Sequence, residues 1–210
     1  MVWSAAQKLK LIGAILGVVV AGYLVGTSLD WARLPGVDLD PSSTVAELHA
    51  SRSAAVTVVM FTDYQCAVCR IDHDGIGRVA LARPDVQFVF NEWAILGPAS
   101  RRPARLALAA RYQGRYLEAR DVLMRVSVSD QNVMASALAE AGVNLTALSQ
   151  DLRRYGSEID RELARTSRQA FSLGLAGTPA YLVGHRLVVG RLAENKLERL
   201  IARAENTIRE

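Results

Sequence analysis

The only two cysteines of the chain stand three residues apart in the segment FTDYQCAVCR, residues 61–70. Positions three apart on a helix lie roughly 5 Å from each other, which is within the Cα separation that a disulfide needs. Cys66 and Cys69 can therefore exchange between a dithiol and a disulfide with little backbone movement. This spacing indicates redox chemistry or metal binding.

A strand that leads into a helix must position this pair. The apolar, β-branched run 54–61 predicts a buried strand, and a helix is predicted to begin at Cys66 and end before Pro84. The unpaired N–H groups and positive dipole end of a helix N-terminus favour a thiolate at Cys66. We therefore expect Cys66 to be the attacking sulfur and Cys69, one turn further in, to be the resolving one.

The elements that follow predict a βαβ unit. The helix has a broken apolar face, made of Ile71, Ile76, Val79 and Ala80. Residues 86–93 then predict a second strand. A strand, a helix and a strand in this order are typical of a parallel pair.

Residues 96–175 contain no convincing strand and read as a helical insertion. Four signals for helix starts divide it, namely Ser100 with Pro103, Ser129-Asp130, Asn144, and Ser157 with Asp160. They predict about four helices. The last of these is expected to bury one face, made of Ile159, Leu163, Ala170 and Phe171.

Two short strands and a helix close the chain. Residues 180–183 and 186–189 predict a hairpin, because Gly184-His185 between them is a two-residue turn with glycine first. The spacing of Leu197, Leu200, Ile201, Ala204 and Ile208 predicts a final amphipathic helix.

The N-terminal segment predicts a membrane anchor. Leu11 to Leu29 is a run of nineteen residues without a charge, preceded by Lys8 and Lys10, and about 20 apolar residues span a bilayer. The positive-inside rule places Met1 in the cytoplasm and the chain after Trp31 outside. A cleaved signal peptide, which would also export the domain, and a buried soluble helix are the alternatives.

The expected organisation is therefore an anchor at 1–30, a linker at 31–53, an α/β domain at 54–95 and 176–210, and the insertion at 96–175. Half of the 210 residues are hydrophobic, which is ample for a core. The net charge is +4, and the many arginines alternate with acids. That pattern is typical of a solvated helical surface, so no nucleic-acid partner is expected.

One further motif completes a resemblance. Gly177-Thr178-Pro179 stands directly before the predicted hairpin, where a proline indicates a bend or a cis bond. A strand, Cys-x-x-Cys at a helix start and a distant Gly-Thr-Pro before a hairpin and a final helix together resemble the thioredoxin superfamily. The helical insertion makes residues 54–210 similar to its DsbA-like branch of exported thiol-disulfide oxidoreductases.

The resemblance implies a thioredoxin fold and a role for each matching residue. Cys66 corresponds to the nucleophile and Cys69 to the resolving cysteine. Pro179 corresponds to the cis-proline beside the active disulfide, and Thr178 to the residue whose backbone pairs with an incoming peptide. No cofactor is implied.

Two positions depart from the strong oxidants of this branch, which carry His before the second cysteine and an acid in the strand six residues before the first. This chain has Val68 and Met60 there. Since Val68 cannot stabilise a thiolate at Cys66, a milder oxidant is expected. The group that accepts the Cys69 proton stays open, with Asp63 close in sequence.

The favoured function is exchange of the Cys66–Cys69 disulfide with cysteines of exported proteins, on the periplasmic side of the inner membrane. A quinone-linked thiol oxidase of the membrane would re-oxidise the pair. A membrane-tethered reductase fed by an electron donor would use the same residues. A static disulfide or two buried thiols are a structural alternative. A tethered binding protein is another, either a metal carrier that uses Cys66 and Cys69 or a module that holds substrates and in which redox turnover is secondary. The metal site would take His73 on the same helix face, with a fourth ligand from His49, His185 or Asp63.

Overall fold

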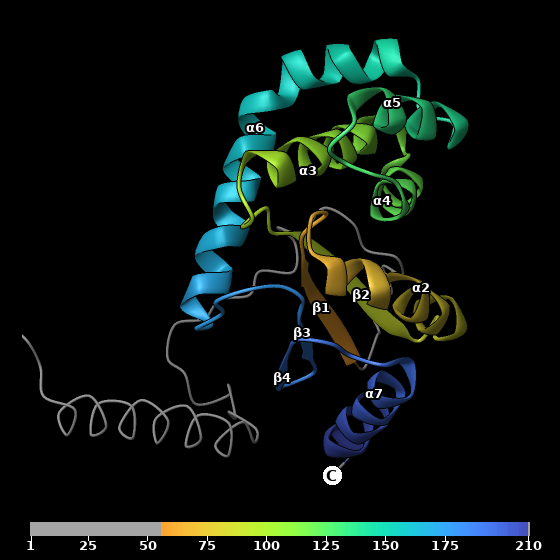
Figure 1. Cartoon of the computed structure of the whole chain (residues 1–210). Helices are drawn as coiled ribbons and strands as arrows, with labels where there is room; N and C mark the ends of the chain where they lie inside the picture. The colour runs from red at the N-terminus through yellow and green to blue at the C-terminus, as the bar shows by residue number, and fades with distance from the viewer. Residues whose placement is uncertain (1–55, 210) are drawn as a thin grey trace, which may run out of the picture.

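A mixed sheet of four strands, in the order β2-β1-β3-β4, forms the centre of the protein in a computed structural model that describes residues 56–209 (Figure 1). β1 (Val56–Thr62) and β2 (Val86–Glu92) run parallel, as the βαβ pattern predicts. β3 (Ala180–Val183) runs antiparallel to β1, and β4 (Arg186–Val189) pairs with β3 as the predicted hairpin.

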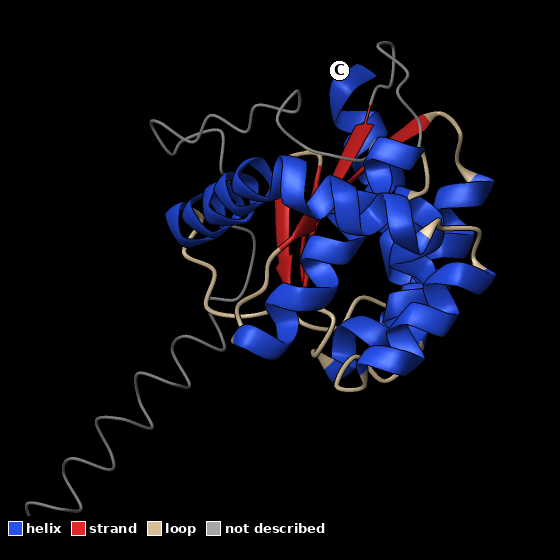
Figure 2. Cartoon of the chain, turned by 90° about the horizontal axis from the view of Figure 1, so that it is seen from above, coloured by secondary structure: helices blue, strands red, loops and turns tan. Residues whose placement is uncertain are grey.

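Helices cover both faces of this sheet, because the strands are apolar on both sides. One face carries the even-numbered residues of β1 and β2 and packs under α2 (Ala67–Ala82) and α7 (Glu194–Arg209). The other face packs against the C-terminal part of α6 (Leu145–Ser172), as Figures 1 and 2 show. The sheet therefore lies between two helical layers, which is the arrangement of a thioredoxin fold.

The insertion consists of α3 (Pro98–Ala110), a short 3-10 turn, α4 (Tyr116–Arg125), α5 (Gln131–Glu140) and most of α6. It packs against the end of the sheet at which α2 begins (Figure 1). Asp130 and Asn144 cap α5 and α6 through their side-chain oxygens, as predicted.

One predicted helix start is wrong. α6 runs without a break through Ser157, which lies exposed on its polar side. Asp160 forms ion pairs with Arg101 and Arg105 of α3 instead of opening a helix. An acid that pairs across two helices carries the same local sequence signal as a cap, and only the packing distinguishes them. α3 likewise starts at Pro98, two residues before Ser100.

Two apolar faces were also assigned incorrectly at single positions. Ile71 is 61% exposed and Phe171 is 59% exposed, although both were expected to be buried. In α2 the buried positions are Cys69, Asp72, Ile76, Val79 and Ala80. A buried carboxylate has therefore taken the place that the hydrophobic pattern gave to Ile71.

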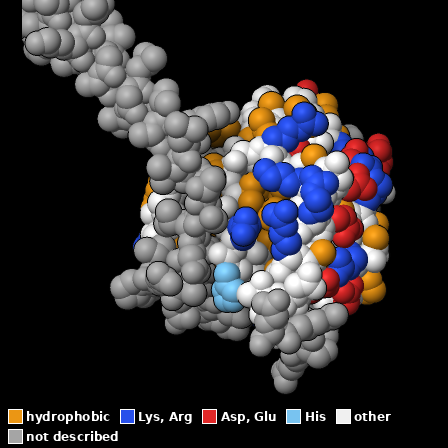
Figure 3. All heavy atoms as spheres, turned by 90° about the horizontal axis from the view of Figure 1, so that it is seen from below, with side chains coloured by type: hydrophobic (Ala, Val, Ile, Leu, Met, Phe, Trp, Pro, Cys, Tyr) orange, Lys and Arg blue, Asp and Glu red, His pale blue; other side chains and the backbone are white. Residues whose placement is uncertain are grey.

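Within residues 56–209, no helix combines the length and the hydropathy that a bilayer crossing needs. The predicted span Leu11–Leu29 and the predicted linker 31–53 lie outside the described residues, so both stay predictions. Basic side chains gather on the face of the domain that Figure 3 shows, with acidic ones beside them. Exposed bases of α7 include Lys196, Arg199 and Arg203. Glu194 and Glu198 of α7 form ion pairs with Arg78 of α2 and with Arg83 at the end of α2.

Candidate active site

Cys66 is the N-cap residue of α2 and presents its sulfur to the open end of the helix. Its backbone is extended, with φ −73° and ψ 111°, and the N–H of Cys69 donates to its Sγ at 3.3 Å. Such N–H groups have no partner inside the helix, so a negative sulfur at this position completes their hydrogen bonding. The predicted placement of the cysteine pair at the helix start is confirmed.

The two sulfurs differ in their surroundings. Both are free thiols, with Cys66 7% exposed and Cys69 3% exposed. Burial raises the pKa of the Cys69 thiol strongly, and its hydrogen bond with Cys66 raises that pKa further. Cys69 therefore stays protonated near neutral pH.

The loop before β3 brings the second motif to the same sulfur. The Thr178–Pro179 bond is cis, as predicted. The Cys66 thiol donates to the carbonyl oxygen of Thr178 at 3.3 Å, across 112 positions of the sequence. The fold therefore places the Cys-x-x-Cys and Gly-Thr-Pro motifs against each other. Their meeting is what makes the arrangement a candidate redox site.

Asp63 organises the turn between β1 and α2. Its buried carboxylate accepts from the N–H of Gln65 at 2.7 Å, from the hydroxyl of Ser100 at 2.6 Å and from the N–H of Leu96 at 3.0 Å. These contacts tie the turn before Cys66 to the start of α3. The carboxylate that sequence reasoning considered for the Cys69 proton is thus engaged in holding this turn.

Asp72 is a buried carboxylate of α2 that the sequence did not single out. It accepts from the hydroxyl of Tyr181 at 3.1 Å and from the N–H of Leu192 at 2.7 Å. Tyr181 stands opposite Met60 in the sheet, so the acid at this place comes from α2 and not from β1. An acid one turn after Cys69, on the side of the helix that faces the sheet, was the available signal.

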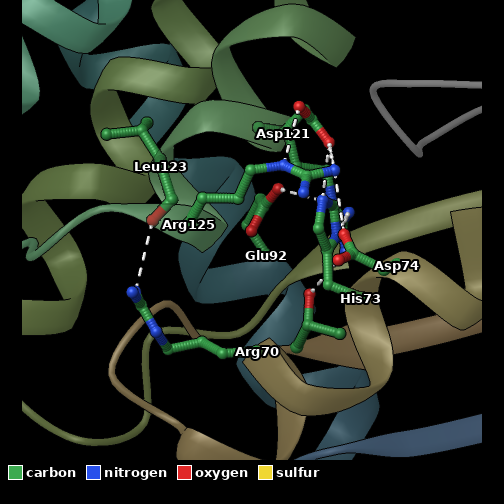
Figure 4. A network of polar contacts seen from close by, with 9 residues as sticks. Arg70, His73, Asp74, Glu92, Asp121, Leu123 and Arg125 are labelled. Atoms are coloured by element: carbon green, nitrogen blue, oxygen red, sulfur yellow. Dashed lines mark hydrogen bonds and ion pairs between the residues drawn. The ribbon is translucent and has the colours of Figure 1, made fainter.

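The side chains of Arg70 and His73 on α2 form hydrogen bonds with the insertion (Figure 4). Arg70 donates to the carbonyl oxygens of Leu123 at 3.4 Å and Val126 at 2.7 Å. Both ring nitrogens of His73 are engaged, Nε2 with Asp121 at 2.8 Å and Nδ1 with Arg120 at 3.2 Å. Two side chains of α4 therefore cover the His73 ring, and His73 is not a solvated residue of α2.

Burial lowers the pKa of His73, and the nearby Arg120 guanidinium lowers it further. Among residues 56–209, no three His, Cys, Asp or Glu side chains are grouped as a metal site would require. The structure therefore does not bring His73, His185 and Asp63 together with the cysteines, and His49 lies outside the described residues.

A second buried polar cluster lies between α4 and the sheet. Glu92 ends β2 and accepts from the hydroxyls of Tyr64 at 2.9 Å and Tyr116 at 2.6 Å. Arg120 of α4 lies 3.7 Å from the same carboxylate. Sequence reasoning missed this cluster, because charges on a strand end and on a helix are normally solvated.

Comparisons with known proteins agree with this geometry. Residues 57–202 match the family model described as DSBA-like thioredoxin domain. A thioredoxin-like oxidoreductase from Silicibacter pomeroyi DSS-3 is 34% identical, with a TM-score of 0.68 over 73% of this chain and 88% of that one. No curated protein sequence matches the chain.

Two more distant structures share the fold. The thiol-disulfide exchange protein alpha-DsbA2 from Wolbachia pipientis has a TM-score of 0.72 at 20% identity, covering 79% of this chain and 88% of that one. A periplasmic thioredoxin-like protein from Salmonella enterica serovar Typhimurium has a TM-score of 0.65 at 21% identity, covering 81% and 94%.

Proposed function

Because the chain belongs to the family of DsbA-like thioredoxin domains and is a thiol-disulfide oxidoreductase, we propose that it oxidises cysteines of exported proteins as a moderate oxidant. The observation that carries this proposal is the contact of Cys66 Sγ with both the start of α2 and the Thr178 carbonyl. An attacking sulfur needs the first contact, and a docking peptide needs a backbone group beside the sulfur with which it can pair once the sulfur has reacted.

The oxidation proceeds by two exchanges. A substrate thiolate attacks Cys66 of the Cys66–Cys69 disulfide, the S–S bond breaks, and Cys69 leaves with the electron pair and takes up a proton. A second substrate thiolate then attacks the substrate sulfur of the mixed disulfide and releases Cys66 as a thiolate. The substrate loses two electrons, which the enzyme holds as its dithiol. Because burial raises the pKa of Cys69, the protonated leaving thiol is the stable product of the first exchange.

Thr178 and Pro179 are the proposed docking residues. The Thr178 carbonyl oxygen accepts from the Cys66 thiol in the free protein, and the cis-proline follows it directly. An extended peptide that carries its cysteine to Cys66 would place a backbone N–H against this carbonyl. Main-chain pairing of this kind accepts many sequences, which suits an enzyme with varied substrates.

The proposed location is the periplasmic side of the inner membrane, with Leu11–Leu29 as a single-pass anchor. The uncharged run with its preceding lysines supports this. The similar Salmonella protein is described as periplasmic, which is in keeping with it. A thiol oxidase of the membrane, linked to quinones, is the proposed partner that restores the disulfide.

The experiment is to trap the mixed disulfide. In the full chain, Cys69→Ser should accumulate a mixed disulfide with a model protein that contains a disulfide. The Cys66 thiolate attacks that bond, one substrate sulfur leaves as a thiolate, and the resolving thiol that would release the substrate is missing. Cys66→Ser, the matched control, should trap none, since burial raises the pKa of the Cys69 thiol and keeps it protonated. Equal trapping by both variants, or none by either, would overturn the roles of the two cysteines.

The direction of electron flow is tested in cells. Rapid acid quenching followed by alkylation should find the Cys66–Cys69 pair mainly as a disulfide if the chain is an oxidant. A mainly reduced pair at steady state would favour the membrane-tethered reductase, which uses the same residues.

A further inference from the structure

The starting observation is an ion pair that is buried between α4 and the sheet. The side chains of Arg120 and Glu92 are 5% and 1% exposed, and Arg120 Nε lies 3.7 Å from Glu92 Oε1. Burying two charges is costly unless their geometry compensates for the lost water, and replacement by apolar residues is often neutral or stabilising. A pair of this kind beside a redox site therefore invites a functional explanation.

The compensation within this pair is incomplete. Glu92 Oε1 takes both tyrosine hydroxyls, while Glu92 Oε2 and Arg120 Nε are buried without a hydrogen-bond partner among the described residues. A salt bridge with good geometry would use these two atoms. Arg120 and Glu92 thus form an ion pair in which these two atoms are not hydrogen-bonded to each other.

The Arg120 guanidinium lies between the end of β1 and α2. Its NH1 is 3.2 Å from Nδ1 of His73, one turn beyond Cys69 on α2, and its NH2 donates to the hydroxyl of Thr62 at 3.3 Å, four residues before Cys66. Its carbon lies 4.2 Å from the centre of the Phe90 ring. Figure 4 labels His73 of α2, Glu92 of β2 and Asp121 of α4, which lie near one another in this region.

Electrostatics connects the guanidinium to the dithiol. Burial lowers the pKa of Arg120, while Glu92, the two tyrosines and, last, Cys69 raise it, so the cysteine pair lies within electrostatic reach of the guanidinium. Burial raises the pKa of Glu92, so its ionised form is less stable than that of a solvated carboxylate. His73 is kept neutral by burial and by Arg120, so it adds no second cation.

We propose that Arg120 is a positioning residue of the redox pair, whose buried positive charge stabilises the thiolate of the reduced form. It would supply, from the insertion, part of the stabilisation that Val68 and Met60 cannot give. The negative charge of Glu92 opposes the positive charge of Arg120 and so reduces the electrostatic potential that Arg120 produces at the sulfurs. This inference rests on the proposed function and deepens it, since it names what tunes the Cys66–Cys69 couple.

The positive charge of Arg120 affects the redox equilibrium because only the reduced protein carries a negative charge on its sulfurs. Two glutathione thiols and the Cys66–Cys69 disulfide give glutathione disulfide, a Cys66 thiolate, a Cys69 thiol and one proton released to solvent. Two electrons pass to the protein. The oxidised protein carries no charge on its sulfurs, whereas the reduced one carries a negative charge. A nearby cation therefore favours reduction of the protein disulfide and makes it a stronger oxidant.

The test uses two variants of the full chain with opposite expected signs. Glu92→Gln keeps an oxygen acceptor for the two tyrosines and removes only the negative charge, so the equilibrium constant for reduction by glutathione should rise. Arg120→Met should lower it. One charge in a partly screened interior corresponds to roughly a tenfold change in each direction. The pH midpoint for alkylation of Cys66 should fall in Glu92→Gln and rise in Arg120→Met.

Arg111→Met is the matched control, because it also breaks a partly buried ion pair, that of Arg111 with Glu162 in the insertion. The hydrogen bonds of the Arg111 side chain involve the insertion and not α2. It should lower stability without moving the glutathione equilibrium. An unchanged or lowered equilibrium constant in folded Glu92→Gln would overturn the inference, whether or not Arg120→Met folds. A purely structural role would give shifts of one sign or none.

The two levels of the account fail differently. A wild-type chain that forms no Cys66–Cys69 disulfide with glutathione would contradict the proposed function itself. A wild type that exchanges normally, with variants that share its equilibrium constant, would contradict only the role of Arg120.

Discussion

Two thiols of the same kind acquire different chemistry here because the helix start treats them differently. Cys66 lies at the N-cap with an N–H donor on its sulfur, while Cys69 is turned into the core, where burial raises its pKa. The first can carry a negative charge and meet a substrate, and the second is poised to return a proton. This asymmetry follows from the strand-to-helix turn and could be predicted from the apolar run before Cys66 and the helix that begins there.

At residue 68 the prediction concerns redox strength. Val68→His introduces a donor and a partial positive charge beside the helix start, so the variant should be more oxidising than the wild type. Because about 30 mV corresponds to about 1.4 kcal/mol for a two-electron couple, one good contact corresponds to a shift of tens of millivolts. A glutathione titration measures it. An unchanged or less oxidising variant would contradict the argument from Val68.

His73 makes stability depend on pH. Its pKa is lowered in the folded protein, so the unfolded chain, with a value of about 6.5, binds the proton first as pH falls. Its contribution is therefore present above pH of about 6.5 and is lost as pH falls through the lower folded value. Glu92, whose pKa is raised, acts with the opposite sign. The wild type should lose more unfolding free energy than His73→Gln between pH 7.5 and 5, as urea unfolding at each pH would measure. Parallel profiles would refute this assignment.

At the scale of elements, signals that act locally were read correctly and those that depend on packing were not. The strand before Cys66, the caps at Asp130 and Asn144 and the Gly184-His185 hairpin turn follow from neighbouring residues. Whether Asp160 opens a helix or pairs with α3, and whether Ile71 or Asp72 faces the core, depends on elements far away in the sequence. The ion pair of Arg120 and Glu92 could not be predicted for the same reason, because α4 and β2 meet only in the folded protein.

Two glycines give a prediction at this scale. Gly77 lies inside α2, and an added Cβ would meet no atom within 4 Å, so Gly77→Ala should stabilise the fold by about 0.5–1 kcal/mol through helix propensity. Gly184 has φ +56°, and its added Cβ would lie 3.0 Å from Ala204 Cβ. Gly184→Ala should therefore destabilise the fold, by about 1–2 kcal/mol for the backbone alone. Urea unfolding compares the two, and effects of the same sign would contradict the backbone argument.

For the whole molecule, the insertion and the thioredoxin part share one hydrophobic core. A single cluster of buried side chains extends from Val58 and Ile76 to Leu123 and Leu138 of the insertion. Such a core predicts one cooperative transition, in which far-UV circular dichroism and tryptophan fluorescence have the same midpoint. Leu123→Ala should lower both midpoints together, with a loss of about 2–5 kcal/mol. A variant in which one probe moves without the other would show that the two parts unfold separately.

The measurement that tests the central claim most directly is the redox equilibrium of the full chain with glutathione, followed by alkylation of free thiols. The account predicts one two-electron couple between Cys66 and Cys69. Its midpoint should lie between about −270 mV, as in thioredoxin, and about −120 mV, as in DsbA. Absence of a reversible Cys66–Cys69 disulfide, or a midpoint outside that interval, would contradict it.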